Sequence, residues 1–378
     1  MMLGVSVKLV KIILLNFLLF VAITGSLVFL IVISSETLRF VKSKFLYKNI
    51  ECIRASCFEA YKDILWAKKH FKEYSEVKFH YETPIVWRAD SFKGDTINIS
   101  ENNFARKTLS RNKPKDDSKV IFFFGGSVVW GVGSNDENTI PSHFQNISGY
   151  KTKNFGENAW TSDQSLMYLI KLIKDGHRPD YVIFINGYND ASKCGNKFGD
   201  EHGILTEDDL RLKFSESIRK KSKITFNNFF SIPSEFVQRI KSTIATKKAK
   251  GGSLTYTSNC LKSNLHLKIA ENLYKNWKIA KILVEDNGGE FIAIIEPMLA
   301  FTDTKIDPRI NFNNKNVHTI EKKKIYSHLL KITKDEPYIY DFKSIYNSID
   351  DYIFIDEVHV TPFANKFMAN KIYNIILD

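Results

Sequence analysis

The sequence predicts an α/β protein in which a mostly parallel sheet is covered by helices on both faces. Short apolar runs typical of buried strands alternate with longer segments whose apolar residues recur at helical spacing. Strands separated in this way by helices pair in parallel, and the connecting helices cover the sheet. With 378 residues, 44% hydrophobic and 25% charged, the chain has room for one large globular domain and attachments.

The first predicted strand, residues 120–124, organises the rest of the chain. It is a run of β-branched and aromatic side chains, followed by two glycines and Ser127. A serine on a glycine-flanked turn after a parallel strand is exposed and held by the backbone, as a nucleophile requires. Taken alone, a Gly-Gly-Ser turn before a helix is common, and it is neither a Walker loop nor a complete dinucleotide fingerprint. The partners of Ser127 must therefore decide its role.

The other elements follow in alternation. Further strands are predicted at 153–156, 181–185, 291–295 and 338–342. Helices are predicted at 139–147, 162–174, 265–285, 317–333 and 362–377. The alternation is interrupted once, at residues 191–264, which we interpret as an insertion. It forms either a lid over the site or a surface loop without fixed structure.

The amino terminus predicts a membrane anchor. Residues 12–35 are almost wholly apolar, contain no charge and are long enough to cross a bilayer as a helix after the tail 1–11. A cleavable signal peptide is the alternative, but the apolar run is longer than a usual signal core. More positive charges follow the span than precede it, so the positive-inside count by itself would place the bulk of the chain in the cytoplasm. Those before it are Lys8 and Lys11, and those after it are Arg39, Lys42, Lys44 and Lys48.

Residues 36–118 are predicted to connect the anchor to the catalytic domain. The first part, to residue 76, is charged and aromatic with apolar residues at helical spacing, which indicates a helical stalk. The second part, 84–111, is polar and indicates an extended lead-in. The domain itself is predicted at 119–378.

The net charge of +12 is unevenly placed. Residues 211–250 contain eleven Lys or Arg and two Glu, so this stretch carries most of the surplus. No nucleic-acid module is recognisable in it, and we predict a solvated basic surface and no nucleic-acid partner.

The four cysteines are Cys52, Cys57, Cys194 and Cys260. No pair has zinc-site spacing, so neither a metal nor a cofactor is predicted. The even count suits disulfides in an oxidising compartment as well as four reduced thiols.

Polar residues that can carry chemistry follow several predicted strands. Ser127, Gly156 and Asn189 each lie at a carboxyl end, where a parallel sheet places its ligands. Asp356 and His359 lie three residues apart before the last helix, a spacing that lets the carboxylate reach one imidazole nitrogen while the other faces a serine.

Four blocks of the sequence together resemble the SGNH hydrolases, the GDSL-like esterase and lipase superfamily. The blocks are G-G-S-V-V-W-G, N-F-G-E-N-A-W, N-G-Y-N-D and D-E-V-H, in the order of the family and with roughly its spacing. The resemblance covers about residues 119–377. It implies a three-layer α/β/α sandwich with a five-stranded parallel sheet, of the flavodoxin-like type.

The resemblance also implies roles for the residues of the blocks. Ser127 would be the nucleophile and His359 the base, oriented by Asp356. Gly156 and Asn189 would join the Ser127 N–H in the oxyanion hole. The chain departs from the family at Gly126, where the family has Asp, and at Val128, where it has Leu. The first departure removes a carboxylate that supports the turn but no member of the triad.

The expected function is hydrolysis of an ester, with a short acyl group such as acetyl on a small molecule or a cell-surface glycan. Transfer of the acyl group to a glycan and a non-catalytic scaffold role are the alternatives. The resemblance places the domain outside the cytoplasm. In such a compartment we predict a disulfide between Cys194 and Cys260, which bracket the insertion, with Cys52 and Cys57 free or paired locally.

Overall fold

The computed structural model describes residues 15–20, 23–24, 52–111, 114–195, 200–205 and 260–377. The chain divides into two units, Met1–Ile53 and Arg54–Asp378. In the first unit, residues 15–20 and 23–24 are helical. Among the described residues, no helix is both long enough and apolar enough to cross a membrane. The tail 1–11 and most of the predicted span 12–35 lie outside the described residues, so the anchor stays a prediction.

The second unit is built on a five-stranded parallel sheet with the strand order β6-β5-β7-β8-β9. The strands are β5 (Val120–Gly125), β6 (Lys151–Asn154), β7 (Tyr181–Asn186), β8 (Glu290–Ile295) and β9 (Ile339–Asp341). The predicted α/β class and the five-stranded parallel sheet are confirmed. The largest shift is in β6, because Phe155 and Gly156 leave the sheet and form the loop that follows it.

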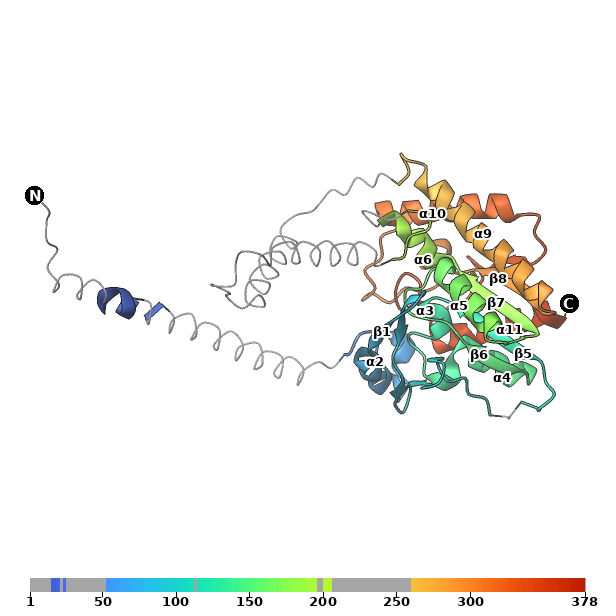
Figure 1. Cartoon of the computed structure of the whole chain (residues 1–378), viewed down its shortest axis with the longest axis horizontal. Helices are drawn as coiled ribbons and strands as arrows, with labels where there is room; N and C mark the ends of the chain where they lie inside the picture. The colour runs from blue at the N-terminus through green and yellow to red at the C-terminus, as the bar shows by residue number, and fades with distance from the viewer. Residues whose placement is uncertain are drawn as a thin grey trace, which may run out of the picture. The chain divides into compact units, whose positions relative to one another are not determined.

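Long helices cover both faces of this sheet (Figure 1). One layer contains α5 (Ser162–Lys174), α9 (Leu265–Asp286) and α10 (Val317–Thr333), and the other contains α4 (Ile140–Ser148) and α11 (Pro362–Leu377). Alternate side chains of β5 enter the two cores: Phe122 and Phe124 face the first layer, and Ile121 and Phe123 face the second. Burial on both faces explains why this strand is a continuous apolar run.

The segment before the sheet belongs to the same unit. Its elements are η1 (Glu59–Tyr61), α2 (Ala67–Glu76), β1 (Phe79–Glu82), β2 (Val86–Ala89), β3 (Phe92–Lys93) and β4 (Asn98–Ile99). β1 pairs with β2 and β3 with β4, both antiparallel. The extended lead-in predicted from the sequence is thus two short hairpins.

Residues 54–76 pack on the domain instead of forming a separate stalk. The Tyr61 side chain is 1% exposed, and its hydroxyl donates a hydrogen bond to the Gly133 carbonyl at 2.6 Å. The Glu73 carboxylate accepts the N–H of Thr96 at 2.9 Å. Tyr61, Ala67 and Phe71 are buried in this way, and the compact unit begins at Arg54 and not at the predicted residue 119.

The predicted disulfide between Cys194 and Cys260 is present, with a Cα–Cα distance of 5.4 Å. It joins η3 (Ser192–Gly195) to the segment that leads into α9. Cys52 and Cys57 are not free thiols either. Of the predicted insertion, residues 191–195, 200–205 and 260–264 are described, so the proposed lid lies outside the described residues.

Candidate active site

Ser127 is the first residue of the short helix α3 (Ser127–Trp130), directly after β5. The two glycines before it allow close packing of the strand ends. A Cβ atom on Gly125 would lie 2.3 Å from the Ile185 carbonyl oxygen of β7. The Ser127 side chain is therefore held at the carboxyl end of the central strands, where parallel α/β sheets place their active sites.

Asp356, His359 and Ser127 form a continuous chain of hydrogen bonds. His359 Nε2 lies 2.7 Å from Ser127 Oγ, and His359 Nδ1 lies 2.5 Å from Asp356 Oδ2. The other carboxylate oxygen accepts the N–H groups of Val358 and His359 at 2.9 and 2.8 Å. The loop is closed by an antiparallel bridge between Phe354 and Val360. The structure thus brings together residues that are more than two hundred positions apart.

The electrostatics of this chain assign its protons. Burial raises the pKa of the Asp356 carboxyl, but the charge of His359 and the hydrogen bonds to the carboxylate outweigh burial and hold the pKa below its ordinary value. An ionised carboxylate only accepts, so His359 Nδ1 carries the proton that points at Asp356. In the neutral imidazole, Nε2 is then the acceptor for the Ser127 hydroxyl.

The Asn189 amide lies against Gly126, the residue before Ser127. Asn189 is in α6 (Tyr188–Ala191), after β7, and its Nδ2 donates to the Trp160 carbonyl at 2.9 Å. A Cβ atom on Gly126 would lie 2.3 Å from this same Nδ2. The amide therefore fills the space that a side chain at position 126 would occupy. This explains why residue 126 is a glycine here, at the position where the family that the sequence resembles has Asp.

Gly156 packs against α3, but its N–H has an acceptor already. A Cβ atom on Gly156 would lie 2.4 Å from the Trp130 nitrogen, so only glycine fits against α3. The Gly156 N–H donates to Asn154 Oδ1 at 3.0 Å, and Asn154 Nδ2 donates to the Val129 carbonyl at 2.9 Å. The predicted oxyanion donor is thus part of a chain that fixes α3, with Asn154 as the link that the sequence did not single out.

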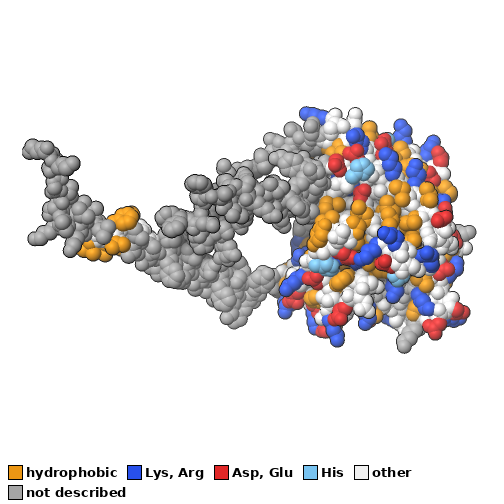
Figure 2. Space-filling view, in the orientation of Figure 1, with side chains coloured by type: hydrophobic (Ala, Val, Ile, Leu, Met, Phe, Trp, Pro, Cys, Tyr) orange, Lys and Arg blue, Asp and Glu red, His pale blue; other side chains and the backbone are white. Residues whose placement is uncertain are grey.

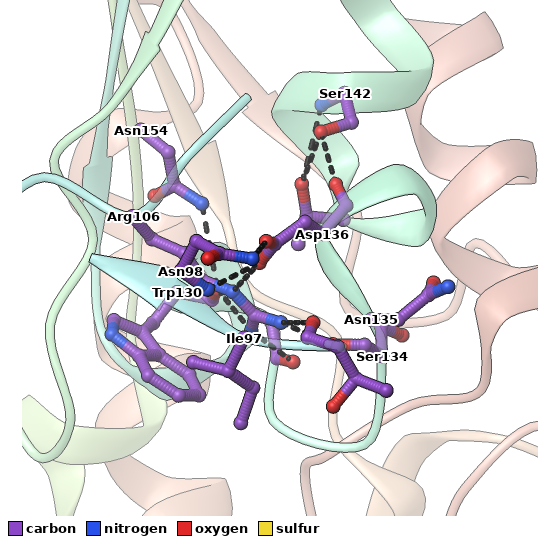
Figure 3. Close-up of polar contacts among 12 residues, drawn as sticks. Ile97, Asn98, Arg106, Trp130, Ser134, Asn135, Asp136, Ser142 and Asn154 are labelled. Atoms are coloured by element: carbon purple, nitrogen blue, oxygen red, sulfur yellow. Dashed lines mark hydrogen bonds and ion pairs between the residues drawn. The ribbon is translucent and has the colours of Figure 1, made fainter. Parts of the chain in front are cut away.

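A buried arginine holds the other end of α3 (Figure 3). The Arg106 guanidinium donates to the carbonyls of Trp130 at 2.9 Å, Gly131 at 2.7 Å and Ser134 at 2.5 Å. Its Nε pairs with Asp136 at 3.1 Å, and both side chains are buried. Because these carbonyls lie at and beyond the last residue of the helix, Arg106 fixes where the turn after Ser127 ends.

A second polar cluster joins the Asn189 block to the loop that contains Asp356 and His359. The Tyr188 hydroxyl donates to Glu357 Oε2 at 2.7 Å, and Lys322 Nζ contacts both the hydroxyl at 2.9 Å and the carboxylate at 3.0 Å. Burial raises the pKa of Glu357, but the Tyr188 hydrogen bond and the Lys322 charge outweigh it and hold the pKa below its ordinary value. This triangle ties the neighbour of Asn189 to the neighbour of Asp356.

Glu296 binds the backbone of Tyr188, the residue before Asn189. Its buried carboxylate accepts the Tyr188 N–H at 2.9 Å at the end of β8. Burial raises the pKa of Glu296 to about 8, and the nearby Asp190 raises it further, against the Tyr188 hydrogen bond. The group is therefore protonated at neutral pH.

We expect the Glu296 carboxyl to make stability pH-dependent. The folded state holds the Glu296 proton more tightly than the unfolded state, so its stabilising effect is complete below about pH 4.5 and is lost as the pH rises to about 8. In that window stability should fall by about 1.4 kcal/mol per pH unit from this group. Glu296→Gln keeps an acceptor for Tyr188 and should flatten the dependence of Tm on pH between 5 and 8. Equal slopes in the two proteins would contradict the assignment.

Within the described residues, one group of side chains has the spacing of metal ligands: Cys194, Cys260 and Glu321. The two sulfurs are bonded to each other, so they do not offer thiolates to a metal.

The fold and the site together define an α/β protein that carries a serine–histidine–aspartate arrangement. No protein-family model matches the chain, and no curated protein matches it. Solved structures to which it is similar include a member of the lipolytic G-D-S-L family from Veillonella parvula, with 11% identity, a TM-score of 0.37 and coverage of 68% of this chain and 98% of that one. A carbohydrate acetylesterase from Sinorhizobium meliloti has 13% identity, a TM-score of 0.35 and coverage of 68% and 98%. An extracellular lipase from Streptomyces rimosus has 13% identity, a TM-score of 0.37 and coverage of 68% and 100%.

Proposed function

We propose that the protein is a serine esterase that hydrolyses the ester of a short acyl group, such as acetyl, carried by a cell-surface glycan. The observation that supports this proposal is the chain from Asp356 through His359 to Ser127, with contacts of 2.5 and 2.7 Å. Ser127 is buried, with 8% of the residue exposed, and not exposed as the turn alone predicted. The glycan is the part of the proposal that follows from the resemblance of the sequence blocks.

The first half of the reaction forms an acyl-serine. His359 Nε2 takes the proton of Ser127 as Oγ attacks the ester carbonyl carbon, and the carbonyl π electrons move to its oxygen. When the tetrahedral intermediate collapses, the bond to the leaving alkoxide breaks, and His359 returns the proton to it. The ionised Asp356 stabilises the imidazolium that exists between these steps.

The negative oxygen of the intermediate needs donors on the Asn189 side of Ser127. We assign it to the Ser127 N–H, which a helix leaves without an intrahelical acceptor, and to the second N–H of the Asn189 amide. Each such donor contributes about 3 kcal/mol of transition-state stabilisation. Gly156, whose N–H is bonded to Asn154, takes the role of packing against α3.

The second half of the reaction releases the acid. A water loses its proton to His359 as its oxygen attacks the acyl carbon, and the proton then returns to Ser127 Oγ as the ester bond to serine breaks. No step uses a metal or a cofactor.

A covalent probe tests the proposal on the full chain. The purified protein should hydrolyse p-nitrophenyl acetate, and a serine-directed fluorophosphonate should abolish this activity while adding one mass adduct to the peptide that contains Ser127. A folded protein that neither turns over the ester nor reacts with the phosphonate would overturn the proposal and favour a non-catalytic role.

We also propose that the protein is a single-pass membrane protein with its catalytic domain outside the cytoplasm. The apolar run at 12–35 supports the anchor, and the bond between Cys194 and Cys260 fits an oxidising compartment. After reduction of intact cells, a membrane-impermeant maleimide should label Cys194 and Cys260. Labelling only after the membrane is permeabilised would place the domain in the cytoplasm.

A further inference from the structure

A groove of about 740 Å³, lined by none of Ser127, Asp356 and His359, lies along the β6 edge of the sheet. One wall is the edge strand β6, and the other is the segment of residues 91–108, which contains β3 and β4. The two walls meet at a single bridge between Arg106 and Asn154. The volume of the groove is in the range of ligand-binding sites, roughly 300–1,000 Å³. We call this hollow the edge groove.

Both walls of the edge groove carry lysines. Lys151 and Lys153 come from β6, and Lys93 and Lys107 come from the opposite segment, whereas Glu101 is the one acidic lining residue. Among the described residues, none of these lysines has a carboxylate within ion-pair distance, although Lys151 Nζ donates to the Asp116 carbonyl. Over the described part of the face seen in Figure 2, acidic and basic side chains are interspersed. The groove is thus a local concentration of positive charge.

Protection of the sheet edge explains only half of this pattern. Lysines on an edge strand prevent pairing with other chains, which accounts for Lys151 and Lys153. The Thr152 N–H between them is already bonded to Gln145 Oε1 at 3.0 Å. Edge protection gives no reason for Lys93 and Lys107 on the facing wall. Charges of one sign on both sides of a hollow repel each other, and an anion between them relieves the repulsion.

The remaining lining groups favour a carbohydrate among the possible anions. Hydroxyls and amides alternate with the lysines, which suits sugar hydroxyls; they include Ser91, Ser100, Asn103 and Thr108. Phe92 is the one aromatic lining residue, whereas single-stranded nucleic acid is held by several stacking rings. The apolar lining residues Ile99 and Ala105 are buried, so the groove offers little surface to a lipid chain. The Arg106 side chain is paired with the buried Asp136, so it is not counted among the groups that would bind an anion.

We propose that the edge groove binds a carboxylated carbohydrate chain. The lysines on both walls pair with the carboxylates, and the hydroxyl and amide side chains bind the sugar hydroxyls. This binding site is separate from the triad and does not depend on the proposed esterase activity.

Binding of short oligogalacturonates to the full chain, measured by calorimetry, tests the proposal. We expect binding that weakens as salt is raised, and no binding of a maltooligosaccharide of the same length, which lacks carboxylates. Lys107→Glu/Lys153→Glu should weaken binding by about tenfold or more, because it places negative charge on both walls. The matched control, Lys174→Glu/Lys331→Glu, makes the same charge change on α5 and α10 and should bind as the unchanged chain does.

The outcomes separate this proposal from the esterase proposal. The groove variant should hydrolyse p-nitrophenyl acetate normally, and Ser127→Ala should still bind oligogalacturonate. If the charge-reversal variant does not fold, Lys107→Gln/Lys153→Gln serves in its place and should also bind more weakly. Absence of oligogalacturonate binding, equal loss in the control, equal binding of maltooligosaccharide, or tighter binding of oligothymidylate or phosphatidylglycerol vesicles would overturn the proposal.

Discussion

Ser127→Ala should reduce the turnover of p-nitrophenyl acetate by about three to six orders of magnitude, because it removes the atom that forms the acyl-enzyme. His359→Ala should cost a similar factor, since the hydroxyl then has no base at 2.7 Å. The double variant should be hardly slower than either single variant, because the two residues act in one step. Steady-state rates of the three variants, each with a melting curve, give the measurement.

The structure offers a matched control for the histidine. His177 is exposed, lies outside the four sequence blocks and should tolerate alanine without loss of activity. A well-folded Ser127→Ala or His359→Ala protein that keeps near-normal activity would show that the hydrogen-bonded chain is not catalytic. An equal loss in His177→Ala would show that the assay reports stability instead.

The sheet could be predicted because its strands are buried on both faces. Residues 120–124 and 181–185 contain no charged side chain and are aromatic or aliphatic throughout, and such runs bounded by turns have few other interpretations. The predicted bounds of the helices 162–174, 317–333 and 362–377 agree with the structure at both ends. Their apolar residues keep the helical period up to a clear break in the pattern.

The packing of the segment before the sheet could not be predicted. Helical spacing around Tyr61 indicates that one face is buried but not what covers it, and a stalk and a docked segment have the same pattern. The contact that distinguishes a docked segment from a stalk is the Tyr61 hydrogen bond to Gly133, which is 72 residues away in the sequence. Leu65, one of the apolar residues at this spacing, is fully exposed, so the pattern also overestimated the buried face.

The sequence predicted which site residues meet, but not how their hydrogen bonds are shared. Ser127, Asp356 and His359 follow from chain order and from the position of strand ends. The acceptor of the Gly156 N–H is Asn154, two residues away; asparagine often makes such an Asx-type bond, but the prediction of Gly156 as an oxyanion donor did not take it into account. Lys322 lies on α10 and reaches Tyr188 and Glu357 only through the fold, so no spacing in the sequence connects the three.

Asn189→Ala should lower kcat for p-nitrophenyl acetate by about 100-fold or more with little change in KM. The amide donates to an oxygen whose charge develops only in the transition state, so its loss slows the chemical step without weakening ground-state binding. An asparagine that only supports the fold would lower Tm and leave kcat nearly unchanged. Rates and melting curves of the same preparation distinguish these results.

Gly126→Ala tests the Asn189 amide by displacing it instead of removing it. Its new Cβ would lie 2.3 Å from Asn189 Nδ2, so the amide must move away from the nucleophile. We expect a loss of kcat comparable to that of Asn189→Ala, and little further loss when Gly126→Ala is added to Asn189→Ala, because the displaced group is then already absent. If the two losses multiply in the double variant, Gly126 acts through the turn that holds Ser127 and not through the Asn189 amide.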